Sequence, residues 1–211
     1  MLFDATKYID YNKIPALIDT VKAAVQDLNW EHLIDELLSS HIEQCDNETW
    51  FCTKLENGQR KFKTNISDLE VIHKDTNQID TKAYWTYLDL YDTSYSASTK
   101  INTKLEQRFS NVIEQTKQLA GVEIMGLHFA SSWAIISTHQ DYVTSDWLNL
   151  VYVLDCPDSD KFSFYIDGEP HSLHKNQSFL FNASTPHSVE NLTSEPFLVF
   201  VLKIKNEFFH D

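Results

Sequence analysis

The fold predicted for this chain depends on the stretch VEIMGLHFASSWAIISTHQD, residues 122–141. It follows Gly121 and opens a series of short β-prone runs that are separated by turn residues, as in Asp167-Gly168-Glu169-Pro170. The runs expected to be strands are 122–137, 147–154, 161–166, 178–182, 187–190 and 197–204. Many short strands at close spacing are typical of a β-sandwich or a β-barrel.

The same stretch ends in an H-x-D tripeptide, His139-Gln140-Asp141, and a second histidine, His187, opens a later β-prone run. Residues two apart in an extended strand lie on the same side, so His139 and Asp141 can reach one metal ion. Two histidines and one carboxylate are the ligands of mononuclear non-haem Fe(II) sites, which leave one face of the metal open. H-x-D is a weak motif by itself, and with 9 histidines in the chain a structural role is the alternative.

The residues before Gly121 predict helices. Apolar residues from Ile14 to Leu28 recur at the spacing of an amphipathic helix, with Pro15 tolerated in its first turn. A second helical stretch follows over 33–38. A third runs from Ile101 to Ile113, with Gly121 as its C-terminal cap.

Two further segments of this first part have a β-like composition. Asn57-Gly58 lies between β-prone runs and predicts a hairpin, because both residues accept positive φ. The aromatic run 84–91 could be a strand or a partly buried loop. No repeat and no Gly-, Pro- or Ser-rich linker divides the chain. We therefore expect one domain, residues 1–211, with a helical and hairpin part at 1–120 and a barrel core at 121–205.

Composition excludes several classes of function. The formal net charge is −14, which repels a phosphate backbone, so we expect no nucleic-acid partner. The sequence contains neither G-x-x-x-x-G-K-[ST] nor G-x-G-x-x-G, the two glycine-rich motifs that bind the phosphate groups of nucleotides. The 3 cysteines, Cys45, Cys52 and Cys156, form no C-x-x-C pair and no even disulfide set. With no secretory signal and no long apolar run, we expect a cytoplasmic protein that has no membrane partner.

In order and spacing, residues 133–204 resemble the Fe(II)/2-oxoglutarate dioxygenases, particularly the aspartyl/asparaginyl β-hydroxylase-like branch. The segments that carry the resemblance are His139-Gln140-Asp141, the strand 148–154, the Gly168 turn, the run 176–182, the segment from His187 to Asn191 and the apolar run 196–202. The resemblance implies an α+β fold, in which helices pack outside a double-stranded β-helix (a jelly-roll or cupin barrel). It also implies Fe(II) and 2-oxoglutarate as cofactors, with His139, Asp141 and His187 as the iron ligands. Asn191 matches the Asn that closes the turn after the second histidine.

One departure from the family concerns the co-substrate. The family normally has an Arg about ten residues after the second histidine, which pairs with the distal carboxylate of 2-oxoglutarate, and this chain has Phe197 there. Lys203 lies six strand residues further on, roughly 20 Å away, so it is not expected to replace that Arg. A buried carboxylate without a cation or several donors is costly. The remaining candidates for the co-substrate and the substrate are the cations Arg60, Lys161 and Lys175, and the side chains of Asn149, Ser131, Trp133, Asn191, Tyr152 and Trp147.

The leading hypothesis is a non-haem Fe(II) oxygenase that uses 2-oxoglutarate and dioxygen to hydroxylate an amino acid, a peptide residue or another small metabolite. A cupin-like metalloenzyme that does not use 2-oxoglutarate is the second hypothesis, which the missing Arg favours. The third is a non-catalytic β-barrel that acts as a binding module. We expect His128 to be a core or rim residue, and His171 and His174 to be surface or loop residues.

Overall fold

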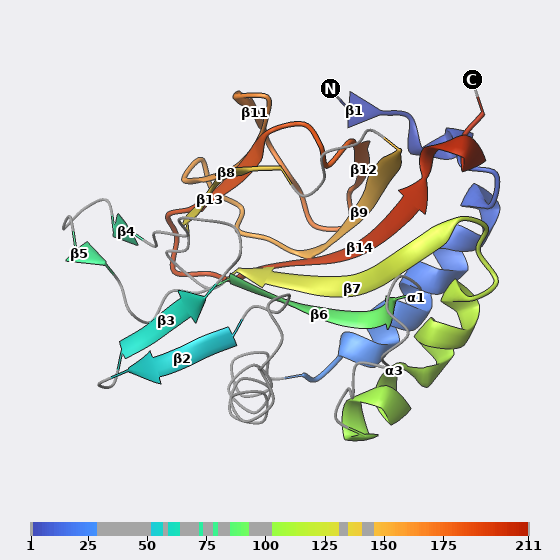
Figure 1. The fold of residues 1–211 in the computed structure, drawn as a ribbon, viewed down its shortest axis with the longest axis horizontal. Helices are drawn as coiled ribbons and strands as arrows, with labels where there is room; N and C mark the ends of the chain where they lie inside the picture. Colours follow the sequence, from blue (N-terminus) through green and yellow to red (C-terminus); the bar gives the residue numbers. More distant parts are fainter. Residues whose placement is uncertain are drawn as a thin grey trace.

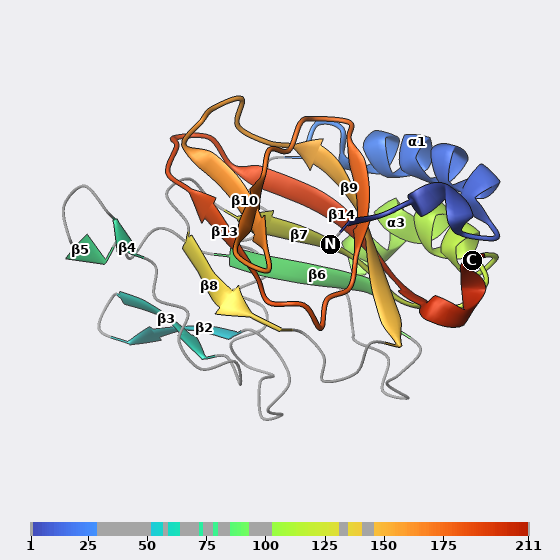
Figure 2. The ribbon, with the colours of Figure 1, turned by 90° about the horizontal axis from the view of Figure 1, so that it is seen from above.

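The computed structural model describes residues 2–28, 52–56, 59–63, 72–73, 78–79, 85–92, 103–130, 135–140 and 146–210. Two antiparallel sheets dominate these residues (Figure 2). In order across the larger sheet, the strands are β1 (Leu2–Phe3), β12 (Ser178–Phe181), β9 (Trp147–Asp155), β14 (Phe197–Lys205), β7 (Val122–Ala130) and β6 (Trp85–Asp92). Across the smaller sheet they are β11 (Glu169–His171), β10 (Phe162–Ile166), β13 (His187–Asn191) and β8 (Ile135–His139).

After β7 the chain passes repeatedly from one sheet to the other, so that β8, β10, β11 and β13 belong to the smaller sheet and β9, β12 and β14 to the larger one. Residues of both sheets meet in one buried cluster, which includes Phe164 and Val189 from the smaller sheet and Phe179 and Val199 from the larger. This is the arrangement of a double-stranded β-helix, and it confirms the predicted fold class.

The molecule has two hydrophobic clusters, an inner one between the two sheets and an outer one between the larger sheet and the helices, and the strand β14 contributes to both. Its residues are buried along almost the whole strand. Leu198 and Phe200 belong to the outer cluster, whereas Val199 and Val201 belong to the inner one. Side chains alternate between the faces of a strand, and a strand buried on both faces reads as a continuous apolar run. Every second residue of β14 therefore faces the interior of the barrel.

Two helices cover the outer face of the larger sheet (Figure 1), as expected. The first, α1 (Ile14–Val25), buries Leu17 and Val21 and has a proline in its first turn. The second, α3 (Thr103–Thr116), contributes Phe109 and Val112 to the outer cluster. The helical stretch predicted at 33–38 lies outside the described residues. No helix in the described part of the chain is long and apolar enough to cross a membrane.

Gly121 does not cap α3 directly, because the helix ends at Thr116 and a turn separates the two. Its φ of +71° favours glycine, and a side-chain carbon added there would lie 2.1 Å from a ring carbon of Phe208. The residue is therefore required by the turn into β7 and by its contact with the C-terminal segment.

The remaining elements are short. The expected hairpin is confirmed, because Glu56 of β2 (Cys52–Glu56) pairs with Gln59 of β3 (Gln59–Lys63). The undecided aromatic run 84–91 forms most of β6, a strand of the larger sheet. The other elements are β4 (Ile72–His73), β5 (Gln78–Ile79) and the 3₁₀ turns η1 (Ala5–Lys7), η2 (Tyr11–Lys13) and η3 (Asn206–Phe208).

Asp10 joins the N-terminal segment to the turn after α3. Its carboxylate accepts a hydrogen bond from the Ala120 N–H at 2.8 Å and pairs with Lys13 Nζ at 2.7 Å. The bond from Lys13 is the main reason that the pKa of Asp10 lies below its ordinary value. Carboxylates held in this way stabilise the fold in their charged form.

We expect Asp10→Asn to lower the free energy of unfolding at pH 7 by about 1 kcal/mol. The folded-state pKa is lowered, so the contribution is present above the unfolded pKa of about 3.9 and is lost as pH falls through the folded value. Denaturant titrations of both proteins at pH 7 and pH 2.5 measure this difference. A gap that persists undiminished at pH 2.5 would contradict the assignment.

Candidate metal centre

The two predicted histidine ligands lie side by side. His187 at the start of β13 pairs in register with His139 at the end of β8. Their ring centroids are 4.3 Å apart, and the ring planes are inclined by 50°. His187 is 6% exposed and His139 is half-buried. Two imidazoles at this separation, from adjacent strands, are in position to share one metal ion.

The orientation of the His187 ring fits a metal ligand. Its Nδ1 lies 2.9 Å from the carbonyl oxygen of Thr185. A carbonyl oxygen only accepts, so Nδ1 carries the proton and Nε2 keeps the lone pair with which a neutral imidazole binds a metal. Metal-binding histidines almost always donate their other ring N–H in this manner.

The loops beside the two histidines are tied together by hydrogen bonds. Gln140 Nε2, next to His139, donates to the carbonyl oxygen of Ser184 at 2.6 Å. Asn182 closes the turn before His187, because its carbonyl oxygen accepts from the Thr185 N–H at 2.9 Å and its side chain accepts from Ser184. These bonds hold the end of β8 beside the start of β13.

A cavity of about 60 Å³ lies between the sheets beside the histidine pair. It is lined by His128, Ile136, His139, Asn149, Val151, Phe164, Phe179, Phe181, His187, Val189, Phe197, Val199 and Val201. The ring of Phe181 meets His187 edge-on at 5.0 Å. This volume holds roughly four water molecules at 10–15 Å³ each. The described residues of the lining are mostly apolar and include no lysine or arginine.

The structure brings only some of the other candidate residues to this cavity. Asn149 lines it and is 5% exposed. Trp147 begins β9 and lies beneath the ammonium groups of Lys203 and Lys205, with Nζ at 4.5 Å and 5.5 Å from the ring centroid. Asp141, Ser131 and Trp133, and the side chain of Arg60, lie outside the described part of the chain.

Two candidates lie elsewhere. Asn191 stands at the other end of β13, where it donates to the carbonyl oxygen of Glu195 and accepts from Thr193, so it closes a turn as the resemblance implies. Tyr152 packs against the outer cluster, and its hydroxyl donates to Asn176 at 3.1 Å. Neither residue lines the cavity.

The cations proposed from sequence are also distant from the histidines. Lys175 pairs with Asp155, the last residue of β9, at 2.9 Å. Lys161 is exposed just before β10, at the end of the barrel opposite to His187. Phe197 lies at that same end, 4% exposed, with its ring 4.8 Å from the ring of Phe162. No cation therefore takes the place of the missing Arg there among the described residues.

Two further inward-facing residues were not among the candidate site residues. His128 lines the cavity from β7 and is half-buried, in agreement with its expected place in the core or at the rim. Lys203 follows Val199 and Val201 on the inner face of β14 and is 7% exposed. Side chains alternate between the two faces of a strand, so the inward direction of both residues follows from the sequence once the face of one other residue on each strand is known.

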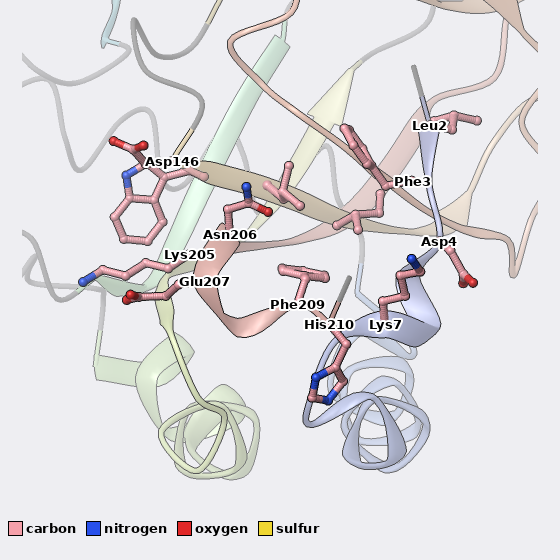
Figure 3. Close-up of a pocket in the computed structure, with 13 residues that line it drawn as sticks. Leu2, Phe3, Asp4, Lys7, Asp146, Lys205, Asn206, Glu207, Phe209 and His210 are labelled. Atoms are coloured by element: carbon pink, nitrogen blue, oxygen red, sulfur yellow. The ribbon is translucent and has the colours of Figure 1, made fainter.

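A second, larger depression lies outside the barrel (Figure 3). This groove of about 1030 Å³ is bounded by the two ends of the chain and the start of β9, and it shares no lining residue with the cavity. Leu2 and Phe3, which are 40% and 43% exposed, project beside Asp4 at one side, and Lys205 and Glu207 lie at the other. It therefore plays no part in the candidate metal centre.

The sequence profile of the aspartyl/asparaginyl beta-hydroxylase family matches residues 27–207. The chain belongs to this family. Aspartyl/asparaginyl β-hydroxylases are Fe(II)/2-oxoglutarate hydroxylases, so the chain is an enzyme of that class. The match extends well beyond residues 133–204, which carry the resemblance. No curated protein matches the sequence.

Solved structures with a partial likeness are cupins and related β-helix proteins. A Cupin_2 domain of an XRE family transcriptional regulator from Enterobacter cloacae is 22% identical, with a TM-score of 0.32, over 38% of this chain and 79% of that chain. A predicted oxalate decarboxylase from Thermotoga maritima is 12% identical, with a TM-score of 0.33, over 44% and 72%. Likeness at this level supports no argument, so the fold assignment rests on the strand topology.

The residues of the site can be tested against the cofactors of the family. Two neighbouring imidazoles, one with its tautomer set by Thr185, fit an Fe(II) ion. Among the described residues no three His, Cys, Asp or Glu side chains gather, and the third expected ligand, Asp141, lies outside them. The cavity lining offers 2-oxoglutarate no cation. Its distal carboxylate needs a partner from beyond that lining.

Proposed function

We propose that this hydroxylase holds Fe(II) through His139, Asp141 and His187 and uses 2-oxoglutarate and dioxygen to hydroxylate an amino acid, a peptide residue or another small metabolite. The observation that carries the proposal is the pairing of His139 with His187 across β8 and β13. Asp141 follows His139 by two positions, the spacing that places both side chains on one side of an extended backbone.

The cofactors would supply an iron-bound oxidant strong enough to attack a C–H bond. The chain's own residues would orient the metal and limit access of water. Thr185 fixes the ring of His187, and the rings of Phe164 and Phe181 pack 6.3 Å and 5.0 Å from it. The carboxylate of Asp141 would fill the position that a halide needs, which favours hydroxylation over halogenation. Trp147, half-buried at the start of β9 near Asn149, remains a candidate to contact substrate.

The alternative is that this chain departs from its family and is a metalloenzyme of the same barrel that does not use 2-oxoglutarate. Phe197 in place of Arg and the apolar cavity favour it. The two proposals share the iron site and differ only in the ligand that completes it. They can therefore be separated by ligand binding without knowledge of the substrate.

The test is an anaerobic titration of the full chain, first with Fe(II) and then with 2-oxoglutarate. The visible charge-transfer band of a 2-oxo acid chelated to Fe(II) is expected after the second addition. Succinate is the matched control, because it has both carboxylates but no 2-oxo group and should give no band. Iron binding without a band would favour the alternative, and an absence of iron binding would refute both.

A further inference from the structure

Lys203 is in an unusual position for a lysine. It is 7% exposed, and it is the one buried lysine or arginine among the residues whose side chains are described. Lysine is almost never fully buried unless it is paired, because removing an ammonium group from water is costly. Lys203 meets this condition through the carboxylate of Glu123, and the pair places a cation on the inner face of the barrel.

The register of the larger sheet places Lys203 at the same end of the barrel as the histidines. Phe181 pairs with Asn149, and Asn149 pairs with Lys203, so the three form one row across β12, β9 and β14. The first member of the row contacts His187, with ring centroids 5.0 Å apart, and the second lines the cavity. Adjacent strands are about 4.8 Å apart, which puts the backbone of Lys203 roughly 10 Å from that of Phe181.

Because of this placement, the distance from residue 197 to residue 203 runs toward the histidine pair. Position 197 lies at the end of the barrel away from the histidines, where β14 begins, and β14 then runs back toward them. A strand distance of roughly 20 Å from Phe197 thus brings Lys203 closer to the histidine pair. The distance of Lys203 from Phe197 is therefore not a distance from the histidine pair.

A β-bulge aims a carboxylate at Lys203. Lys203 pairs with Ile124 and Ile204 with Val122, so Glu123 is the extra residue in β7. Its Oε2 lies 2.5 Å from Lys203 Nζ, and its side chain is 19% exposed against 9% for Lys203. Bulges of this kind often re-aim side chains beside active sites.

We propose that Lys203 receives the distal carboxylate of 2-oxoglutarate, in place of the Arg that the family has at position 197, and that Glu123 holds the ammonium group when the co-substrate is absent. This inference rests on the proposed function. Asn149, between Lys203 and the cavity, supplies a side-chain amide next to the path of the co-substrate. Lys203 would hold the distal carboxylate at the barrel end beside the row, away from the apolar end at Phe197.

The test compares two ligands that differ only at the distal group. 2-Oxoglutarate and 2-oxopentanoate have the same five-carbon chain and the same 2-oxo acid head, but only the first has a distal carboxylate. Both are titrated anaerobically into Fe(II)-loaded protein, with the charge-transfer band as the readout of affinity. The ratio of the two dissociation constants isolates the contribution of the distal carboxylate and needs no turnover.

Lys203→Met should weaken 2-oxoglutarate about 10- to 100-fold, the scale of a lost charge-assisted hydrogen bond, and should leave 2-oxopentanoate within about threefold. Lys205→Met is the matched control, because Lys205 is on the same strand, also lies over Trp147, and is exposed. It should change neither constant. If Lys203→Met is too unstable to assay, the double variant Lys203→Met/Glu123→Gln removes both charges and avoids a buried unpaired carboxylate.

Glu123→Gln should change the affinity for 2-oxoglutarate in the opposite direction from Lys203→Met. Glu123 competes with the co-substrate for Lys203, so its neutralisation should tighten 2-oxoglutarate about fivefold while 2-oxopentanoate is unchanged. If the ion pair is merely structural, both single variants lower the unfolding temperature and neither changes the ratio of the constants. That result overturns the inference. A second result would also overturn it, namely that His128→Phe weakens 2-oxoglutarate binding whereas Lys203→Met does not.

Failure of the inference is separable from failure of the proposed function. If the parent protein binds iron and shows the band with 2-oxoglutarate, the proposed co-substrate stands whatever the variants do. If the parent shows no band with either ligand, the proposed function fails, and with it the inference. A parent that binds both ligands equally well refutes the role of Lys203 alone.

Discussion

Replacement of His187 by alanine is expected to weaken Fe(II) binding by more than about 100-fold, because even outer contacts of metal ligands cost 10- to 100-fold when removed. His187 supplies one of the two imidazoles at 4.3 Å, and no other described His, Cys, Asp or Glu cluster can take over. Anaerobic calorimetry with Fe(II) measures the affinity, and the band with 2-oxoglutarate should vanish together with it.

Two controls make this result specific. His174→Ala alters an exposed histidine outside the cavity and should bind iron as the parent does. His187→Gln keeps more of the buried volume beside Phe181 and therefore separates loss of a ligand from loss of packing. His139→Ala should behave like His187→Ala. If both alanine variants bind iron as tightly as the parent, the proposed metal centre is ruled out. Both hypotheses that depend on it, with and without 2-oxoglutarate, then fail.

Restoring the family's Arg by Phe197→Arg is expected to destabilise the metal-free protein by about 3–5 kcal/mol, the cost of a buried charge without a partner. Phe197 is 4% exposed and packs on Phe162, with ring centroids 4.8 Å apart. The described residues that line the cavity beside it include no Asp or Glu to accept a guanidinium. Chemical denaturation of the two proteins measures the difference.

Phe197→Leu is the control for this substitution, since it stays apolar and should cost only about 1 kcal/mol. An unfolding free energy of Phe197→Arg equal to that of Phe197→Leu would show that this end of the barrel admits water or an anion. In that case the apolar end could accept a carboxylate after all, and the assignment of Lys203 would lose its main support.

The elements of the barrel were predictable from local patterns. The short β-prone runs became β7 with β8, β9, β10, β12, β13 and β14, and Asn57-Gly58 predicted the hairpin, because turn chemistry and alternation are local properties of the chain. The short strand β11 lies where only a turn was expected. The aromatic run 84–91 was ambiguous, because it has no clear period. It became β6 only through pairing with β7, a contact between segments far apart in sequence.

What the sequence by itself determined is most of the barrel strands and the family to which the chain belongs, including the residues His139 and His187. Only the tertiary structure decided that these two rings lie side by side and that Lys203 lies on the inner face of β14 at their end. The physical reason is register. A shift of one residue turns every side chain to the other face, and long-range pairing and the bulge at Glu123 set that register.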